Sequence, residues 1–290
     1  MAGARGQSRK ALPDIFDVLA TSLLILLVAP PAARAQDGRW QFGSAPTFSS
    51  GKYGDDSRTE ILHTPITARR LFDNGDMTFV FPFTCIWGDG GVTVVNGTPV
   101  GRQRLAGSAT GAGRGGRAID SAGVARATPR CGIGDIVVRG RYYLFDERGW
   151  APTIAVRGHV KAPTASPERG LGTGRPDQGL GLEISRTIGG GAVVMVDGGY
   201  TIIGSPADVE YRNSWWYDVG LGGDLAKAVN LSVFFEEYRS IVPGLANARD
   251  VLAAISVTGA TGWRLQLSGE FGLSNGAPDH GVTFGASRRF

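Results

Sequence analysis

Apolar and polar residues alternate along the chain from Trp150 to Lys161. The even positions carry Pro152, Ile154, Val156, Gly158 and Val160, and the odd positions carry Thr153, Ala155, Arg157, His159 and Lys161. A period of two is that of a β-strand with one apolar and one polar face. Similar segments recur to the end of the chain, so the pattern predicts an all-β fold built from many such strands.

Turn signals divide the chain into strands of about ten residues. Asp73-Asn74-Gly75 is a hairpin signal, and it separates a strand at about 58–71 from one at 77–87. Nine more strands are predicted at about 136–145, 150–161, 179–188, 192–203, 215–225, 230–241, 251–260, 263–273 and 281–290. An outer-membrane barrel has an even number of strands, so a further strand is expected at 39–50. The sequence therefore predicts an up-and-down antiparallel transmembrane β-barrel of about twelve strands.

Short and long connections alternate along the chain. The longer ones are expected at about 88–133, 162–176, 204–213, 242–249 and 274–280. Outer-membrane barrels have short periplasmic turns and longer external loops. Phe290 is therefore predicted at the periplasmic rim, where the barrel assembly machinery could bind the C-terminal strand.

Aromatic residues cluster near the predicted strand ends. They are Trp40, Trp87, Tyr142, Trp150, Tyr200, Trp215, Tyr217, Trp263 and Phe290. Such rings suit the headgroup layers of a membrane, so two aromatic girdles are expected.

The N-terminal segment has the three parts of a secretory signal peptide. Arg5, Arg9 and Lys10 precede an apolar run at 18–28, and Ala33-Arg34-Ala35 fits a small-x-small cleavage site. The alternative is a membrane anchor, but the run is shorter than the ~20 residues that a spanning helix needs. We expect a signal peptide at 1–35 and a barrel at 36–290 in the bacterial outer membrane.

The charge balance excludes little by itself. Residues 1–35 contain four basic and two acidic side chains, so their removal lowers the net charge from +4 to +2. No zinc-ligand cluster or RNA-binding signature accompanies the basic residues. No nucleic-acid partner is expected.

Two cysteines flank the longest predicted connection. In an exported protein, Cys85 and Cys131 suggest a disulfide at the base of the loop at 88–133. The alternative is two unrelated apolar residues, with Cys85 facing lipid. The loop is rich in Gly, Ala and Arg. It could fold into the barrel as a gate, contact lipopolysaccharide phosphates, or form a flexible surface loop.

Alternation assigns the charged side chains to the inner face. A basic group that faces lipid at mid-depth costs ~2–4 kcal/mol, which favours an inward orientation. The predicted lumen-lining residues are Arg139, Arg141, Arg157, His159 and Lys161 on a basic wall, Glu183, Asp197, Asp218 and Glu270 on an acidic wall, and Arg264. Facing each other across a narrow lumen, the two walls could orient a dipolar solute or bind an ion. The alternative is mutual neutralisation by ion pairs in a closed interior.

The histidines do not form a catalytic arrangement. Nucleophilic catalysis needs a base within hydrogen-bond reach of a serine, oriented by a third group. His159 is predicted to face inward and has no serine two residues on, His280 adjoins Asp279 in a loop, and His63 has an uncertain facing. No metal-ligand spacing is present. We expect no enzyme, no cofactor and no metal site.

Several short motifs resemble one known family. They are Lys161-Ala162-Pro163-Thr164, Gly170-Leu171-Gly172-Thr173-Gly174, Asp177, Gly179-Leu180-Gly181-Leu182, Gly132-Ile133-Gly134-Asp135, Ser49-Ser50-Gly51-Lys52-Tyr53-Gly54 and Thr64-Pro65-Ile66-Thr67. Together they resemble the family described as "Putative MetA-pathway of phenol degradation". The resemblance implies an outer-membrane barrel of the transporter type, linked by name to aromatic degradation. It implies no catalytic residues.

These observations lead to two hypotheses. The first is an outer-membrane channel for the passive passage of small solutes, with aromatic or amphipathic compounds among the candidates. The second is a plugged structural or binding barrel whose long loop contacts lipopolysaccharide or a partner. Both place the chain in outer-membrane lipid.

Overall fold

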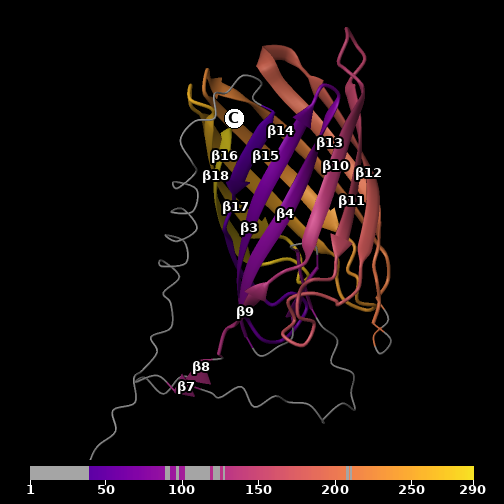
Figure 1. Ribbon diagram of the computed structural model, residues 1–290, viewed down its shortest axis with the longest axis vertical. Helices are drawn as coiled ribbons and strands as arrows, with labels where there is room; N and C mark the ends of the chain where they lie inside the picture. The colour runs from indigo at the N-terminus through magenta and orange to yellow at the C-terminus, as the bar shows by residue number, and fades with distance from the viewer. Residues whose placement is uncertain are drawn as a thin grey trace, which may run out of the picture.

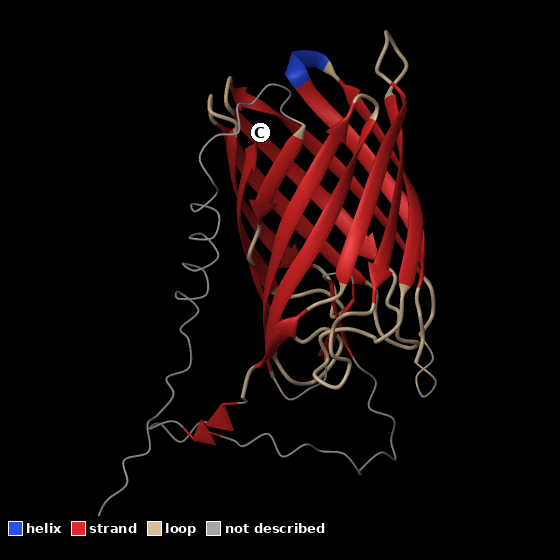
Figure 2. Ribbon diagram, in the orientation of Figure 1, coloured by secondary structure: helices blue, strands red, loops and turns tan. Residues whose placement is uncertain are grey.

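The computed structural model of the chain describes residues 39–88, 92–95, 98–101, 118–119, 125–126, 128–206, 209 and 211–290. The predicted signal peptide and most of the arginine-rich part of the long connection lie outside these residues. Figure 2 shows that the regular structure is β-sheet, apart from one 3-10 turn, η1, at Gly189–Gly191. Within the described ranges, no helix has the length and apolar character needed to cross a membrane.

Fourteen strand segments form one closed antiparallel wall (Figure 1). They are β1 (Trp40–Ser44), β2 (Thr47–Gly51), β3 (Thr59–Phe72), β4 (Gly75–Trp87), β9 (Arg130–Ile133), β10 (Ile136–Phe145), β11 (Thr153–Ala162), β12 (Asp177–Thr187), β13 (Ala192–Ile202), β14 (Ser214–Ala226), β15 (Val229–Tyr238), β16 (Ala248–Thr258), β17 (Trp263–Gly272) and β18 (His280–Arg289). Strand β1 pairs with β3 on one side and with β18 on the other, which closes the barrel.

Two spanning strands are interrupted, so the fourteen segments make twelve strands. Segments β1 and β2 both pair with β3 and β18, on either side of Ala45-Pro46. Pro46 has no N–H to donate, although its carbonyl accepts a hydrogen bond from the Phe284 amide at 3.0 Å. Segments β9 and β10 both pair with β4, on either side of Gly134-Asp135. The predicted twelve-strand all-β barrel is confirmed.

Some predicted boundaries differ from the structure. The strand expected at 150–161 begins at Thr153, because Arg148 and Ala151 form an isolated bridge within the preceding turn. The connection expected at 88–133 ends earlier, because its last four residues form β9 and pair with β4. It also contains two short hairpins, β5 (Val92–Val95) with β6 (Thr98–Gly101) and β7 (Ala118–Ile119) with β8 (Ala125–Arg126).

The two ends of the barrel differ in the length of their connections. The C-terminus lies at the end with the tight turns, the upper end in Figure 1, and we call this the turn end. The long connections gather at the opposite end, which we call the loop end. The rule that outer-membrane barrels have short periplasmic turns predicts that the turn end is periplasmic.

The outer face of the wall is apolar. Leu180 is 70% exposed, and Leu182, Val219, Leu267 and Val282 point outward around the barrel. A soluble protein of this size would bury such residues, whereas a barrel in lipid exposes them. These side chains form the belt that contacts lipid.

Aromatic rings and arginines meet on the outside of the turn end. The ring of Phe42 stacks on Trp40 at 5.9 Å and meets Phe290 at 6.1 Å. The Arg288 guanidinium lies over Phe290 at 4.8 Å and over Trp263 at 5.6 Å. Amphipathic rings and long basic side chains are typical of the headgroup layer, so this rim fits one of the predicted girdles.

The largest apolar core caps the loop end and does not run through the middle of the barrel. It comprises Tyr53, Ile61, Ile86, Val92, Val94, Ala165 and Leu171. Ile61 and Ile86 lie at the loop ends of β3 and β4, and Val92 and Val94 belong to β5. Tyr53 lies in the β2–β3 connection, and Ala165 and Leu171 lie in the β11–β12 connection. Loops and strand ends therefore pack together here as in a small globular core.

Candidate functional site

A cavity of about 550 Å³ lies inside the barrel, and we call it the lumen cavity. Each of the twelve strands contributes at least one lining residue, and Pro99 of β6 reaches it from the long connection. The charged side chains among its lining residues are Arg69, Asp76, Arg139, Arg141, Arg157, Arg239 and Arg264, with His159 beside them. A volume of this size is typical of small-molecule sites.

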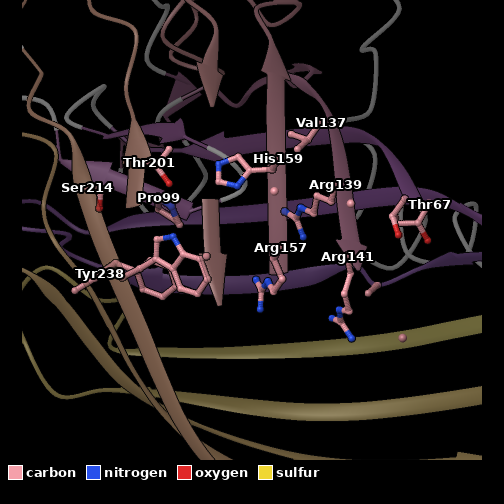
Figure 3. Close-up of a pocket in the computed structure, with 18 of the residues that line it drawn as sticks. Thr67, Pro99, Val137, Arg139, Arg141, Arg157, His159, Thr201, Ser214 and Tyr238 are labelled. Carbon is pink, nitrogen blue, oxygen red and sulfur yellow. The ribbon is translucent and has the colours of Figure 1, made fainter. Parts of the chain in front are cut away.

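Four of the predicted basic residues line the cavity from two neighbouring strands. Arg139 on β10 stands opposite His159 on β11, and Arg141 stands opposite Arg157. Figure 3 shows the four side chains directed into the same space. Like charges that face each other across a strand pair destabilise it, so this basic wall depends on counter-charges from elsewhere.

Five carboxylates form a continuous row across the next five strands, and we call it the acidic row. Glu183 of β12 stands opposite Asp197 of β13, which stands opposite Asp218 of β14. The row continues through Glu236 of β15 and Asp250 of β16. Sequence analysis named the first three residues and missed the last two. Glu236 alternates with outward Val233 and Phe235, which is a signal that could have found it.

The basic wall and the acidic row pair along the barrel wall. Arg157 contacts Asp197, and its Nη1 lies 4.0 Å from Oε2 of Glu183. Nη2 of Arg141 lies 3.2 Å from the same Glu183 oxygen. We predicted walls that face each other across the lumen. The structure differs because β11 adjoins β12, so long arginine side chains reach the carboxylates sideways.

The predicted acidic residues do not line the lumen cavity. This holds for Glu183, Asp197, Asp218 and Glu270. The Asp197 side chain is only 7% exposed, and Glu183 is shared between two arginines. Mutual neutralisation by ion pairs therefore describes this part of the lumen.

The indole of Trp216 lies across two glycines on the cavity wall. A Cβ added at Gly199 would approach its Cζ2 atom to 2.6 Å, and one added at Gly181 would approach it to 3.0 Å. The ring thereby reaches Arg157, whose guanidinium lies 4.8 Å from the ring centroid. This cation–π contact adds a second partner for Arg157. Sequence analysis missed Trp216, because an aromatic residue on a strand gives no sign of which glycines it will cover.

Two further predicted residues lie on β17. Arg264 lines the lumen cavity, and its Nη2 donates to Oγ of Ser256 at 3.1 Å. Glu270 stands opposite Leu252 and beside Gly281, where a Cβ would lie 3.0 Å from its Oε2. Sequence analysis also missed an ion pair at the cavity, in which Nη2 of Arg69 lies 2.6 Å from Oδ2 of Asp76.

Lys161 has a different environment from the other basic residues. It is fully buried and does not line the lumen cavity. Its Nζ donates a hydrogen bond to Oγ1 of Thr173 at 2.9 Å. The same nitrogen forms ion pairs with Oδ2 of Asp177 at 2.7 Å and with Oδ2 of Asp135 at 3.0 Å. We call these four residues the Lys161 cluster.

The Lys161 cluster connects three loops. The other carboxylate oxygen of Asp135 accepts a hydrogen bond from the Ala165 amide at 2.9 Å, and that of Asp177 accepts one from the Gly204 amide at 2.8 Å. Every member of the cluster also lies in the motifs that carry the family resemblance. Those motifs therefore encode a buried polar network at the loop end.

The first hairpin of the long connection packs into the loop end. Val92 and Val94 of β5 are buried in the apolar core beside Leu171. Oγ1 of Thr93 donates to the Gly170 carbonyl at 3.1 Å, and the Val94 amide donates to the same carbonyl at 3.2 Å. Strands β5 and β6 and the connection at 163–176 thus form a unit that we call the loop-end plug. The gate hypothesis for the long connection agrees with this position.

A disulfide joins Cys85 of β4 to Cys131 of β9. The two residues stand opposite each other in the sheet, at the base of the long connection. The bond closes a loop with a sequence separation of 46. It therefore restrains the chain that leads into and out of the loop-end plug.

Replacing Cys85 and Cys131 by serine is expected to loosen the long connection and leave the barrel intact. Chain entropy alone gives a disulfide across a loop of this length a stabilisation of about 4 kcal/mol, because the open chain has more conformations. Hydrogen exchange at 92–101 should become faster while exchange in β13–β17 stays unchanged. Equal protection of 92–101 in the oxidised and double-serine proteins would contradict this.

Two of the histidines considered as catalytic candidates, His63 and His159, lie on different strands of the barrel. Nδ1 of His63 lies 2.9 Å from Oγ1 of Thr84, and no serine hydrogen bond to a histidine is found among the described side chains. His159 lines the lumen cavity. In this part of the chain, no three His, Cys, Asp or Glu side chains are placed to hold a metal ion.

The closed wall, apolar outside and charged inside, defines a β-barrel of the outer-membrane type. The chain belongs to the family described as "Putative MetA-pathway of phenol degradation", which matches residues 75–290. No curated protein sequence matches it.

One solved outer-membrane channel has the same fold. The crystal structure of the COG4313 outer membrane channel from Pseudomonas putida F1 has a TM-score of 0.63 at 13% identity, over 91% of this chain and 100% of that chain. At this identity the likeness establishes the fold alone. The KdgM porin in complex with disordered oligogalacturonate has a TM-score of 0.46 at 8% identity, over 86% and 99%. The P. putida toluene transporter TodX has a TM-score of 0.40 at 11% identity, over 91% and 92%. The predicted family and the outer-membrane fold are both confirmed.

Proposed function

We propose that this barrel is a passive channel for small solutes in the bacterial outer membrane. The observation that carries the proposal is the lumen cavity, which is lined by charged and aromatic side chains, touches all twelve strands and lies inside a wall that is apolar outside. The outer membrane channel with the same fold and the family's link to phenol degradation support this function. The loop-end plug acts as the gate of the channel. The solved structure with the same fold is a channel by name.

The proposal predicts that removing the loop-end plug enlarges the channel. Planar bilayers with the refolded protein should show discrete conductance steps, and a variant that lacks most of 90–128 should show larger ones. The physical reason is that β5 and Pro99 occupy part of the loop end of the lumen. Arg148→Gln, at an exposed position in a turn at the opposite end of the barrel, is the control, with no expected change. No conductance in either protein would reject the channel.

A plugged barrel whose long loop binds a partner is the second candidate function. The buried apolar core at the loop end favours it, because that core would have to open before a solute could pass. The same deletion separates the two functions. A binding loop predicts unchanged conductance, together with loss of binding to immobilised lipopolysaccharide through the arginines at 102–126.

Two further parts of the proposal concern export and assembly. Residues 1–35 would be removed after export, which N-terminal sequencing of the protein from purified outer membranes would check. Strand β18, which is followed by Phe290 at the turn end, would be the segment that the barrel assembly machinery binds. Deleting Phe290 should then reduce the folded barrel in membranes without changing its synthesis.

A further inference from the structure

The lining of the lumen cavity has an excess of positive charge. Six arginines line it, against Asp76 as the carboxylate among its lining residues. Four of the six arginines have an ion-pair or hydrogen-bond partner on a neighbouring side chain. Arg69 pairs with Asp76, Arg141 with Glu183 and Arg157 with Asp197, and Arg264 donates to Ser256. Arg239 also donates to the Asn213 carbonyl at 3.4 Å.

Arg139 is the exception among these six. It is exposed to the lumen, and no hydrogen bond or ion pair to another described residue satisfies its guanidinium. Its cross-strand neighbours are Thr78 on β4 and His159 on β11, and neither is a carboxylate. Nε2 of His159 is buried without a hydrogen-bond partner. Two nitrogen-bearing side chains thus face one cavity with their hydrogen-bonding capacity unused (Figure 3).

An aromatic surface lies close to this polar position. Trp216 is held across Gly181 and Gly199 and contacts Arg157, which is two residues before His159 on β11. Tyr238 stands opposite Trp216 on the next strand and also lines the cavity. Flat rings on a cavity wall favour a planar aromatic ligand by stacking or edge contacts. The cavity therefore offers a guanidinium and an aromatic wall to one small molecule.

We propose that the lumen cavity is a binding site for small aromatic carboxylates, an assignment that rests on the proposed channel function and deepens it. The carboxylate accepts hydrogen bonds from Arg139, whose planar fork matches its two oxygens. The ring lies against Trp216 and Tyr238. A neutral hydrocarbon would displace water from Arg139 without replacing its hydrogen bonds, so it is the poorer ligand. An aliphatic acid would use Arg139 but leave the aromatic wall uncovered.

Titration of the refolded barrel with sodium benzoate tests the site. Isothermal calorimetry should detect benzoate binding. Benzamide should bind about tenfold more weakly, because it lacks the charged carboxylate that hydrogen-bonds to Arg139. Acetate should also bind more weakly, because it leaves the aromatic wall uncovered. Arg139→Gln should lower benzoate affinity by about tenfold and leave benzamide unchanged. Trp216→Leu should weaken both aromatic ligands and spare acetate. Arg148→Gln, at an exposed turn position, should change none of them.

Calorimetry and planar-bilayer recording together separate this inference from the channel function. Conductance with equal affinity for benzoate, benzamide and acetate overturns the aromatic carboxylate site and leaves the channel. Benzoate binding that depends on Arg139 in a barrel without conductance supports the site and rejects the channel. Arg139→Gln that binds benzoate as tightly as the native chain overturns the assignment, provided that its barrel migrates as a folded species.

Discussion

Replacing Lys161 by methionine is expected to undock the loop-end plug and raise the single-channel conductance severalfold. The substitution leaves Asp135 and Asp177 buried without their shared cation. Removing one partner of a buried ion pair costs about 3–5 kcal/mol, because the remaining charge is desolvated and uncompensated. Thr173 is hydrogen-bonded to Lys161 itself, and the loops that hold Ala165 and Gly204 are hydrogen-bonded to the two carboxylates, so we expect these loops to detach together. Planar-bilayer recording and limited proteolysis of 163–176 measure the effect.

Two control variants make this prediction specific. Lys227→Met removes an exposed lysine at the turn end and should change neither conductance nor proteolysis. Adding Asp135→Asn and Asp177→Asn to Lys161→Met removes the buried charges, and this triple variant should regain part of the native closure. If Lys161→Met keeps native conductance and native protease resistance, the Lys161 cluster does not hold the plug.

Replacing Arg157 by alanine is expected to shift the ion selectivity of the channel towards cations. Arg157 pairs with Asp197, approaches Glu183 and lies over the ring of Trp216. Without it, Asp197 of the acidic row loses its cation, and Glu183 keeps Arg141 as its single partner among the described residues. An ion pair at 4 Å near a protein surface is worth about 4 kcal/mol. If about a third of this energy changes the relative barriers for K⁺ and Cl⁻, the ratio of K⁺ to Cl⁻ permeability changes about tenfold.

The reversal potential across a KCl gradient measures this shift. Arg148→Ala, at an exposed position in the β10–β11 turn, is the control and should leave the reversal potential unchanged. A reversal potential identical to that of the native channel in Arg157→Ala would show that ions do not pass Arg157. The basic wall would then have no role in permeation.

The alternation of apolar and polar residues predicts which side chains of a strand face the lumen. A strand in lipid has one apolar face, so every second side chain faces inward. The number of alternating segments along the chain also predicts the number of strands. Alternation is also the basis on which Arg139, Arg141, Arg157 and His159 were predicted to face inward, and these four residues line the lumen cavity. It could not show their partners, because the register between β11, β12 and β13 places Arg157 near Asp197 and leaves Arg139 without a carboxylate.

The loop end was the least predictable part of the molecule. Lys161 has the same alternation as Arg157, yet it is buried in a network with Asp135 and Asp177, which are distant in sequence. Loops have no period, and their packing depends on shapes and hydrogen bonds that form only when several segments meet. Because loops have no repeating pattern, the sequence did not show that Val92 and Val94 of β5, inside the predicted loop at 88–133, would be buried in an apolar core.

By itself, the sequence determined an outer-membrane barrel of twelve strands, its apolar exterior, its inward charges and its family. These properties follow because each strand separates lipid from an aqueous interior, so its side chains must alternate between apolar and polar whatever the other strands do. Only the tertiary structure decided that the basic and acidic residues pair along the wall, that the plug is tied to Lys161, and that Arg139 and Trp216 face one cavity. Those outcomes depend on strand register and loop packing, which bring together residues that no local pattern relates.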